Sequence, residues 1–228
     1  MLTLLTALVL QGAPPHPGYE TREKHDPNGI GKFYLGREIA HVMGHMAAGW
    51  LERPEREREE EPAKAVAALE LKPGMTVADV GVGTGYFAFR MAAAVGEGGK
   101  VLGVDIQPEM LKLLKEAAEK RGAKNVEGVL GTEKDPKLPE GAVDLVLMVD
   151  VYHEFEWPYE MMAAIRKALK PKGRVALIEY RKEDPEVPIK EVHKMSEEQI
   201  KKEMAAAGLK HVKTVGVLPR QHLAIFEK

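Results

Sequence analysis

Three glycines follow a short apolar run in the stretch ADVGVGTGYF, residues 78–87. Gly81, Gly83 and Gly85 alternate with other residues, and glycine permits the positive φ angles and the close backbone approach that a bound ligand requires. A helix expected to begin near Tyr86 would add a partial positive charge at the same place. The pattern predicts a ligand-binding turn between a strand and a helix.

Two carboxylates flank this turn and bear on the ligand that it takes. Asp79 lies two residues before the first glycine, where a carboxylate suits a cationic amino group and disfavours a pyrophosphate. Asp105 ends the next expected strand, where an acidic side chain can hold both hydroxyls of a ribose. The dinucleotide fingerprint requires a last glycine or alanine where Tyr86 stands. The residues therefore disfavour an NAD-dependent oxidoreductase, which remains an alternative.

Ionisable side chains also follow the stretches VDLVLMVD and GRVALIEY, both expected to be strands. His153 comes soon after the first stretch and is the candidate catalytic base, because an imidazole can accept a proton near neutral pH. Glu179 and Arg181 stand at the end of the second, and a long polar loop then reaches His193. We expect these side chains to bind a polar or charged substrate. The alternatives are a hydrogen-bonded wall at His153 and a solvated loop.

The stretch GREIAHVMGHMAAGWLE, residues 36–52, shows apolar residues at helical spacing. On such a helix Arg37, His41 and His45 would share one face. With Tyr34, this face would form a further wall of the substrate pocket. A His-x-x-x-His pair can bind a metal ion, but we expect none here because the helix offers no obvious third ligand. The charge run ERPEREREEEP that follows is expected to be a solvated linker or the end of a helix.

The elements that must position these residues alternate between strands and helices from residue 63 onward. The last two strands, HVKTVGVL and HLAIFEK, are so close that they predict a hairpin. This order predicts an α/β fold with a seven-stranded, mostly parallel, doubly wound sheet and an antiparallel closing hairpin. We expect residues 63–228 to form this domain, residues 16–62 an irregular arm and a helix that caps the site, and residues 1–15 a signal-like or mobile segment.

The composition disfavours several function classes. The chain has 228 residues, with 33 basic and 35 acidic side chains and a formal net charge of -2, so it lacks the basic excess typical of nucleic-acid binding. It has no cysteine, which excludes disulfides, zinc–thiolate sites and a thiol nucleophile. The apolar run Leu2–Leu10 is too short to span a bilayer. We expect a cytoplasmic protein without a membrane partner, with export through residues 1–15 as the alternative; the oligomeric state is left open.

These motifs resemble those of class I S-adenosylmethionine-dependent methyltransferases from about Val66 to Lys228. DVGVGTG resembles their first motif, VLGVDIQPEML the segment with the ribose-binding acid, and LKPKGRVALIEY the fifth strand of their small-molecule members. The resemblance implies S-adenosyl-L-methionine as cofactor. It places the following residues around that cofactor: Asp79, Gly81, Gly83, Thr84, Gly85, Asp105, Ile106, Thr132, Glu133 and Asp150.

The activity that the resemblance implies is in-line transfer of a methyl group to a small polar acceptor. Alignment alone can supply roughly 7–11 kcal/mol, so a catalytic base is optional. The amino-methylating signature of nucleic-acid enzymes is absent, since DVYHEF stands in its place. Two alternatives stay open: a non-catalytic protein that binds S-adenosylmethionine, and a methyltransferase with a protein substrate. The sequence does not fix the acceptor atom.

Overall fold

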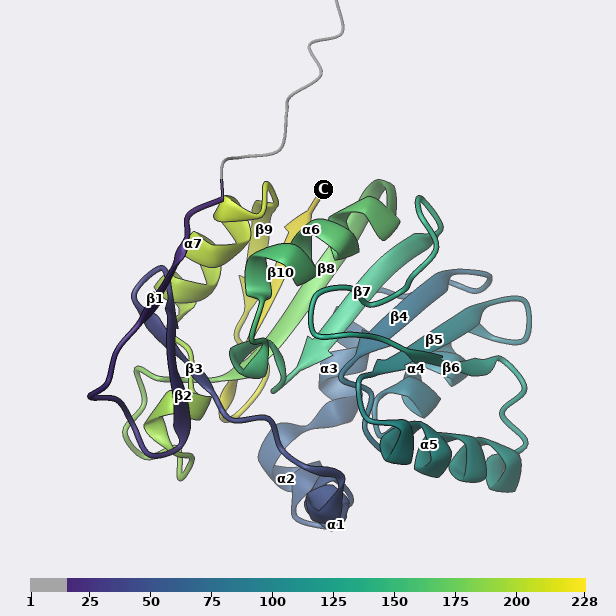
Figure 1. Cartoon of the computed structure of the whole chain (residues 1–228). Helices are drawn as coiled ribbons and strands as arrows, with labels where there is room; N and C mark the ends of the chain where they lie inside the picture. Colours follow the sequence, from purple (N-terminus) through teal and green to yellow (C-terminus); the bar gives the residue numbers. More distant parts are fainter. Residues whose placement is uncertain (1–15) are drawn as a thin grey trace, which may run out of the picture.

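The structure is a computed structural model that describes residues 16–228, so the signal-like segment expected at residues 1–15 lies outside the described residues. Its main sheet contains β4 (Thr76–Val80), β5 (Lys100–Asp105), β6 (Val126–Leu130), β7 (Val143–Val149), β8 (Leu169–Tyr180), β9 (Lys210–Val215) and β10 (Gln221–Glu227). The strands lie in the order β6-β5-β4-β7-β8-β10-β9, and β10 runs antiparallel to both its neighbours. The predicted mostly parallel sheet and its antiparallel closing hairpin are confirmed (Figure 1).

Helices cover both faces of this sheet. One face carries α3 (Pro62–Ala68), α4 (Ala88–Val95) and α5 (Pro108–Arg121), and the other carries α6 (Pro158–Ala168) and α7 (Glu197–Ala206) (Figure 1). The apolar side chains form two core clusters accordingly. Met91 and Leu114 belong to the first cluster, and Met162 and Met204 to the second. The central strands are therefore buried on both faces, and a ligand is expected at the ends of these strands.

Local sequence signals explain where two of these helices begin and end. Pro108 begins α5, where its missing N–H costs nothing, and Gly122 ends it with a φ of 65°. The Ser196 side chain caps α7 by accepting a hydrogen bond of 3.1 Å from the Gln199 amide. These signals lie within a few residues of each helix end, which is why the sequence reveals them.

The segment before the main sheet differs from the prediction. β1 (Tyr19–Thr21), β2 (Gly29–Tyr34) and β3 (Arg37–Ala40) form a small antiparallel sheet where an irregular arm was expected. The predicted helix over residues 36–52 was wrong for its first part, because positive φ angles at Leu35 (51°) and Gly36 (95°) turn the chain tightly from β2 into β3. Helical structure begins only with the 3-10 helix η1 (His45–Ala47) and with α1 (Ala48–Leu51).

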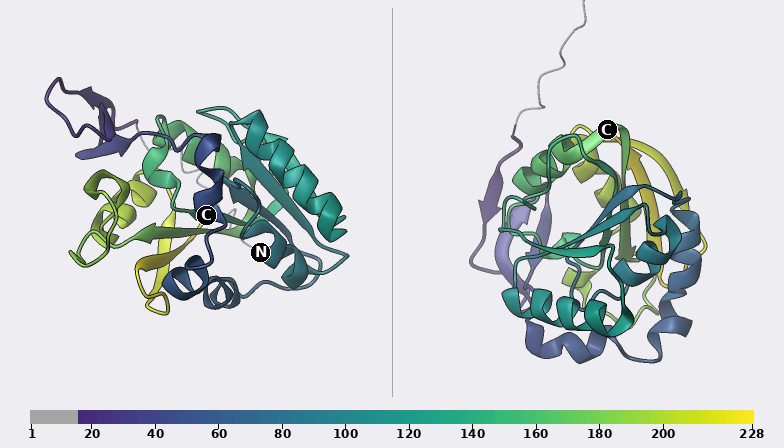
Figure 2. Two further views of the ribbon diagram at one scale, coloured as in Figure 1. Left: turned by 90° about the horizontal axis from the view of Figure 1, so that it is seen from below. Right: turned by 90° about the vertical axis from the view of Figure 1, so that its right-hand side faces the viewer.

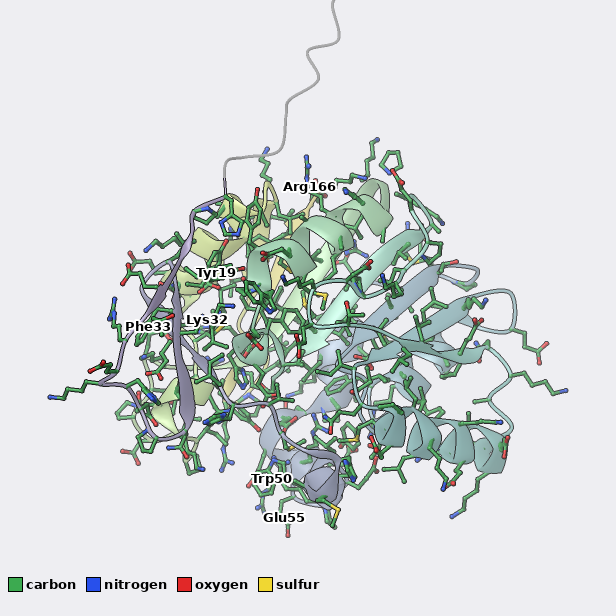
Figure 3. The ribbon with its side chains drawn as sticks, in the orientation of Figure 1. Tyr19, Lys32, Phe33, Trp50, Glu55 and Arg166 are labelled. Carbon is green, nitrogen blue, oxygen red and sulfur yellow. The ribbon has the colours of Figure 1, made fainter. Side chains whose placement is uncertain are left out.

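The small sheet packs beside α6 and α7 and projects from the molecule in the left view of Figure 2. The Tyr19 hydroxyl donates a hydrogen bond of 2.5 Å to Glu160 on α6. The Lys32 ammonium lies 3.0 Å from the centre of the Trp157 ring. Figure 3 shows Tyr19, Lys32 and Phe33 together on this side of the molecule. The amino-terminal strands are thus part of the folded body rather than a loose arm.

Two short helices, α1 and α2 (Arg56–Glu60), lie below the carboxyl ends of the parallel strands in Figure 1, and Figure 3 labels Trp50 and Glu55 at this end. The solvated linker predicted over ERPEREREEEP was wrong for part of this run. Arg56 is only 5% exposed and Glu60 only 1%, because the Arg56 Nε donates to Glu60 Oε2 at 2.7 Å. Within residues 16–228 no helix combines the length and apolar character needed to span a bilayer.

Candidate active site

A cavity of about 510 Å³ lies at the carboxyl ends of β4, β5, β7 and β8, against α1 and α2. This volume falls in the range of small-molecule sites. One part of its wall is the glycine turn after β4 with the residues after β5. Another part is the 3-10 helix η2 (Tyr152–Glu154) after β7 and the 3-10 helix η3 (Glu191–His193) after β8. The topology therefore brings both predicted groups of site residues to one space.

Most residues expected around the cofactor line this cavity: Gly81, Gly83, Asp105, Ile106, Thr132, Glu133 and Asp150. The structure does not bring the others to its surface. Asp79 lies behind the turn at 3% exposure, and Thr84 Oγ1 donates outward to Glu52 Oε1 at 2.5 Å. Gly85 has a φ of 92°, and a Cβ there would point toward Leu114 and Phe89 rather than the cavity. Sequence spacing cannot distinguish a glycine that faces a ligand from one that faces a helix.

The turn after β4 has the shape of a cradle. Gly83 has a φ of 52°, and a Cβ there would lie 2.6 Å from Cδ1 of Leu51 in helix α1. The Gly83 amide donates to Asp105 Oδ2 at 3.0 Å, and the Gln107 amide donates to Asp105 Oδ1 at 2.9 Å. These bonds fix the carboxylate at the cavity wall and leave it lone pairs for two further donors. That arrangement fits the vicinal hydroxyls of a ribose.

Asp150 follows β7 with an unusual backbone φ of 49° and is half-buried. Its Oδ2 accepts a hydrogen bond of 2.7 Å from Gln221, whereas Oδ1 has no partner among the described residues. Burial, together with the negative charges of Glu60 and Glu179, raises the pKa of Asp150 well above its ordinary value. A buried acceptor without a partner is costly. A cationic amino group in the cavity would satisfy it and favour its ionised form.

Sequence reasoning missed Arg53, Arg56 and Glu60, which come from the α1–α2 segment and line the cavity. They form a polar cluster with Tyr180, at the end of β8, where the sequence had placed a rim residue. Arg53 Nη2 donates to Glu60 Oε1 at 2.7 Å, and the Tyr180 hydroxyl donates to the same oxygen at 2.9 Å. The available signal was the i, i+4 spacing of Arg56 and Glu60, but that spacing is equally common on exposed helices. The cluster supplies guanidinium groups beside the glycine turn.

His153 lies on η2, lines the cavity and is 2% exposed. Its Nδ1 is 2.6 Å from Oε2 of Glu179, a fully buried residue near the end of β8. Its Nε2 is 3.1 Å from Nδ1 of His193 on η3. The Glu154 carboxylate completes the group, with Oε1 3.7 Å from the same His193 nitrogen. The residue predicted as a base thus has a carboxylate on one ring nitrogen and a second imidazole on the other.

Burial controls the charges of this group. It lowers the pKa of His153 to about 4 and that of His193 to about 4, and it raises the pKa of Glu154 to about 7 and that of Glu179 to about 8. Both imidazoles are therefore neutral near pH 7. When Glu179 is ionised, its carboxylate accepts a hydrogen bond from Nδ1–H of His153. The free lone pair of that ring then lies on Nε2, toward His193 and the cavity.

The residues predicted to bind substrate fall into two groups. His193 lines the cavity, and Glu179 stands directly behind His153. The structure does not bring the remaining predicted residues to the cavity: Tyr34, Arg37, His41 and Arg181.

The reasons are visible in their surroundings. Tyr34 is fully buried beside Tyr19, with ring centroids 5.4 Å apart, and Arg37 pairs with Glu203 on α7. The Arg181 guanidinium donates to the carbonyl oxygens of Leu218 and Pro219. His41 is exposed just after β3.

The fold, the glycine turn and the carboxylates after β5 and β7 define the class of this protein. Residues 71–221 match a family model described as a methyltransferase domain, and the chain belongs to that family. The chain therefore contains a methyltransferase domain of the class that uses S-adenosylmethionine as its cofactor. The cradle at Gly83, the carboxylate of Asp105 and the unpartnered Oδ1 of Asp150 fit this cofactor.

Three known proteins illustrate the relationship. A SAM-dependent methyltransferase structure from Aquifex aeolicus is 29% identical, with a TM-score of 0.77 over 82% of this chain and 99% of that one. The ubiquinone/menaquinone biosynthesis C-methyltransferase of Paraburkholderia phymatum is 26% identical over 73% of this chain and 67% of its own length. The arsenite methyltransferase of Halobacterium salinarum is 36% identical over 50% of this chain. The chain spans only 29% of that last protein's length.

Proposed function

We propose that this protein transfers the methyl group of S-adenosylmethionine to a small polar molecule that enters the cavity beside His153. One observation carries the proposal. His153, with Glu179 behind it at 2.6 Å, lines the same cavity as Gly83 and Asp105. A potential proton acceptor and the cofactor cradle therefore face one space of about 510 Å³.

The residues of the cavity divide between cofactor and acceptor. Asp105 would hold the ribose hydroxyls, Asp150 the amino group, and the Arg53 guanidinium the carboxylate of the cofactor. The bound cofactor supplies a methyl group activated by its sulfonium. The protein then has to align the acceptor and exclude water, and alignment alone can contribute about 7–11 kcal/mol.

His153 is the group that we propose to activate the acceptor. When Glu179 is ionised and accepts a hydrogen bond from Nδ1–H, Nε2 of His153 can accept a proton from a hydroxyl, amine or thiol in the cavity. A base in this position contributes roughly 10²–10⁴-fold to the rate. Charged and polar neighbours on the cavity wall, among them Glu154 and Lys190, support a polar acceptor.

The names of the relatives are consistent with small-molecule acceptors without identifying one. Two of the relatives are named for arsenite and for quinone biosynthesis. Arsenite is not the acceptor that we propose, because arsenic methylation depends on thiols and this chain has no cysteine. The acceptor is better sought among small phenols, hydroxy acids and amines.

The proposal is tested by release of S-adenosylhomocysteine during incubation with such a panel. Wild type should turn over at least one acceptor, and His153→Ala should lose about 10²–10⁴-fold in kcat with little change in cofactor affinity by calorimetry. His222→Ala is the matched control, since His222 is also buried and bonded to a carboxylate, Glu183, at 2.9 Å but does not line the cavity.

Two results would contradict the proposal. Tight cofactor binding without product from any acceptor would favour the non-catalytic binding protein. Radiolabelled methyl groups recovered only in a protein fraction would favour a protein substrate.

A further inference from the structure

We propose that His153, Glu154 and His193 bind one divalent transition-metal ion at the acceptor end of the cavity. The three side chains each present one ligand atom to a common space, and all three line the cavity. The binding site itself follows from these residues alone. A role for the ion in holding the acceptor rests on the proposed function.

The spacing of the three ligand atoms suits an ion. His153 Nε2 is 3.1 Å from His193 Nδ1 and 3.9 Å from Glu154 Oε1, and the latter two atoms are 3.7 Å apart. The point in the plane of the three atoms that is equidistant from them lies about 2.1 Å from each, within the range of Zn–N and Zn–O bonds. Two imidazole nitrogens 3.1 Å apart also need a proton or a cation between them. The ion would take the place of that proton.

The ligands are held from behind in the way that metal ligands usually are. Glu179 Oε2 lies 2.6 Å from Nδ1 of His153, which is the ring nitrogen that faces away from the proposed ion. Glu179 is itself fixed by the amide of Tyr152, which donates to its Oε1 at 3.0 Å. The amide of Met43 lies 3.2 Å from both oxygens of Glu154 and orients that carboxylate. The site therefore requires no large rearrangement to accept an ion.

The charge and chemistry of the group indicate which ions it takes. Two imidazoles and one carboxylate suit Zn²⁺ and Fe²⁺, whereas Mg²⁺ and Ca²⁺ prefer sites made of oxygen atoms. Two carboxylates, Glu154 and Glu179, face the imidazoles. Lys190, on the same loop as His193, is held by Asn28 Oδ1 at 2.7 Å. With three protein ligands, an ion would keep an open position for a water molecule or an acceptor oxygen.

This inference departs from the sequence-based expectation of no metal ion. That expectation considered His41 and His45 on one helix, whereas the proposed ligands come from η2 and η3, with His153 and His193 40 residues apart. It also sharpens the role of His153. In the ion-free protein Nε2 of His153 keeps the role of base proposed above. Because a nitrogen that ligates an ion has no lone pair left for a proton, His153 in the metal-bound protein would instead position the acceptor through the ion.

The test is a metal titration of tag-free protein that has first been stripped with a chelator. Co²⁺ and Zn²⁺ should bind at one ion per chain, Co²⁺ should show the visible d–d absorption of a low-coordinate site, and Mg²⁺ should not compete. His193→Ala and Glu154→Ala should weaken Co²⁺ binding at least tenfold, and Glu179→Gln should weaken it about 10–100-fold. His222→Ala should bind as wild type does. Circular dichroism identifies any variant that has not folded.

The outcomes separate this inference from the proposed function. Absence of Co²⁺ and Zn²⁺ binding, or equal binding by wild type and folded His193→Ala, would overturn the metal site. Binding lost in His193→Ala but kept in His222→Ala supports it. The titration contains neither cofactor nor acceptor, so a failure to observe methyl transfer leaves its result unaffected.

Discussion

Arg37 and Glu203 form a buried, two-pronged ion pair although 166 residues separate them in sequence. Arg37 Nε donates to Glu203 Oε1 at 2.7 Å, and Nη2 donates to Oε2 at 2.9 Å. The Tyr152 hydroxyl donates to the same carboxylate at 2.8 Å, and Arg37 Nη1 donates to the His153 carbonyl at 3.1 Å. The pair therefore ties β3 and α7 to the η2 turn that carries His153. Arg37 positions the site and does not line it.

We expect Arg37→Met to lower the free energy of unfolding by about 3–5 kcal/mol, because it leaves the Glu203 carboxylate buried without its counter-ion. The double variant Arg37→Met with Glu203→Leu should recover part of this loss, since no charge is then buried. Urea unfolding measures both. Equal losses in the single and double variants would show that the pair is not the cause. Lys213→Met, which breaks the exposed pair with Glu70, should have a far smaller effect.

Asp105→Ala should weaken S-adenosylmethionine binding by roughly 1.5–3 kcal/mol, because charge-assisted hydrogen bonds to the ribose would be lost. Calorimetry with the cofactor measures this directly. Asp144→Asn is the matched control, since Asp144 lies near the start of β7, at the opposite end of the sheet from the cavity. If Asp105→Ala binds S-adenosylmethionine as tightly as wild type does, Asp105 does not bind the cofactor.

Gly83→Val should abolish cofactor binding. Gly83 has a φ of 52°, and the Cβ that valine adds would press on Leu51 in helix α1. Gly74→Val is the matched control, because Gly74 has a similarly unfavourable φ of 85° but its Cβ would meet nothing within 4 Å. Both variants should lose stability through backbone strain, and only Gly83→Val should lose the cofactor. Equal cofactor affinity in the two variants would contradict the cradle.

The main sheet could be predicted from the sequence because its signals are local. The central strands contain short apolar runs, and α5 and α7 carry their own end signals in Pro108, Gly122 and Ser196. The order of these elements then fixes a doubly wound sheet. Because the carboxyl ends of its parallel strands meet at one edge, Asp105 and His153 could be expected near each other without any structure.

The rest of the site depends on contacts between distant residues. The apolar spacing in residues 36–52 fits a helix, yet packing of Ile39 and the ion pair of Arg37 select a strand at its start. Glu60 is charged, but bonds from Arg53, Arg56 and Tyr180 allow it to be buried. Periodicity cannot reveal such partners, because each side chain is interpreted with its neighbours in sequence rather than its neighbours in space.

Asp79 should make the protein less stable as the pH rises from acid to neutral. Burial raises the pKa of this carboxyl from 3.8 to about 7, against the opposing charge of Arg56. Between these two pKa values the unfolded chain has released the proton and the folded protein has kept it. The free energy of unfolding should therefore fall by about 1.4 kcal/mol per pH unit through this window and level off above pH 7.

Other buried carboxyls, such as Glu154 and Glu179, add slopes of the same sign, so the informative quantity is the difference between wild type and Asp79→Asn. Urea unfolding at a series of pH values measures it. Asp79→Asn should show the smaller decline and should be the more stable of the two near pH 8, whereas parallel curves would mean that Asp79 titrates normally in the folded protein.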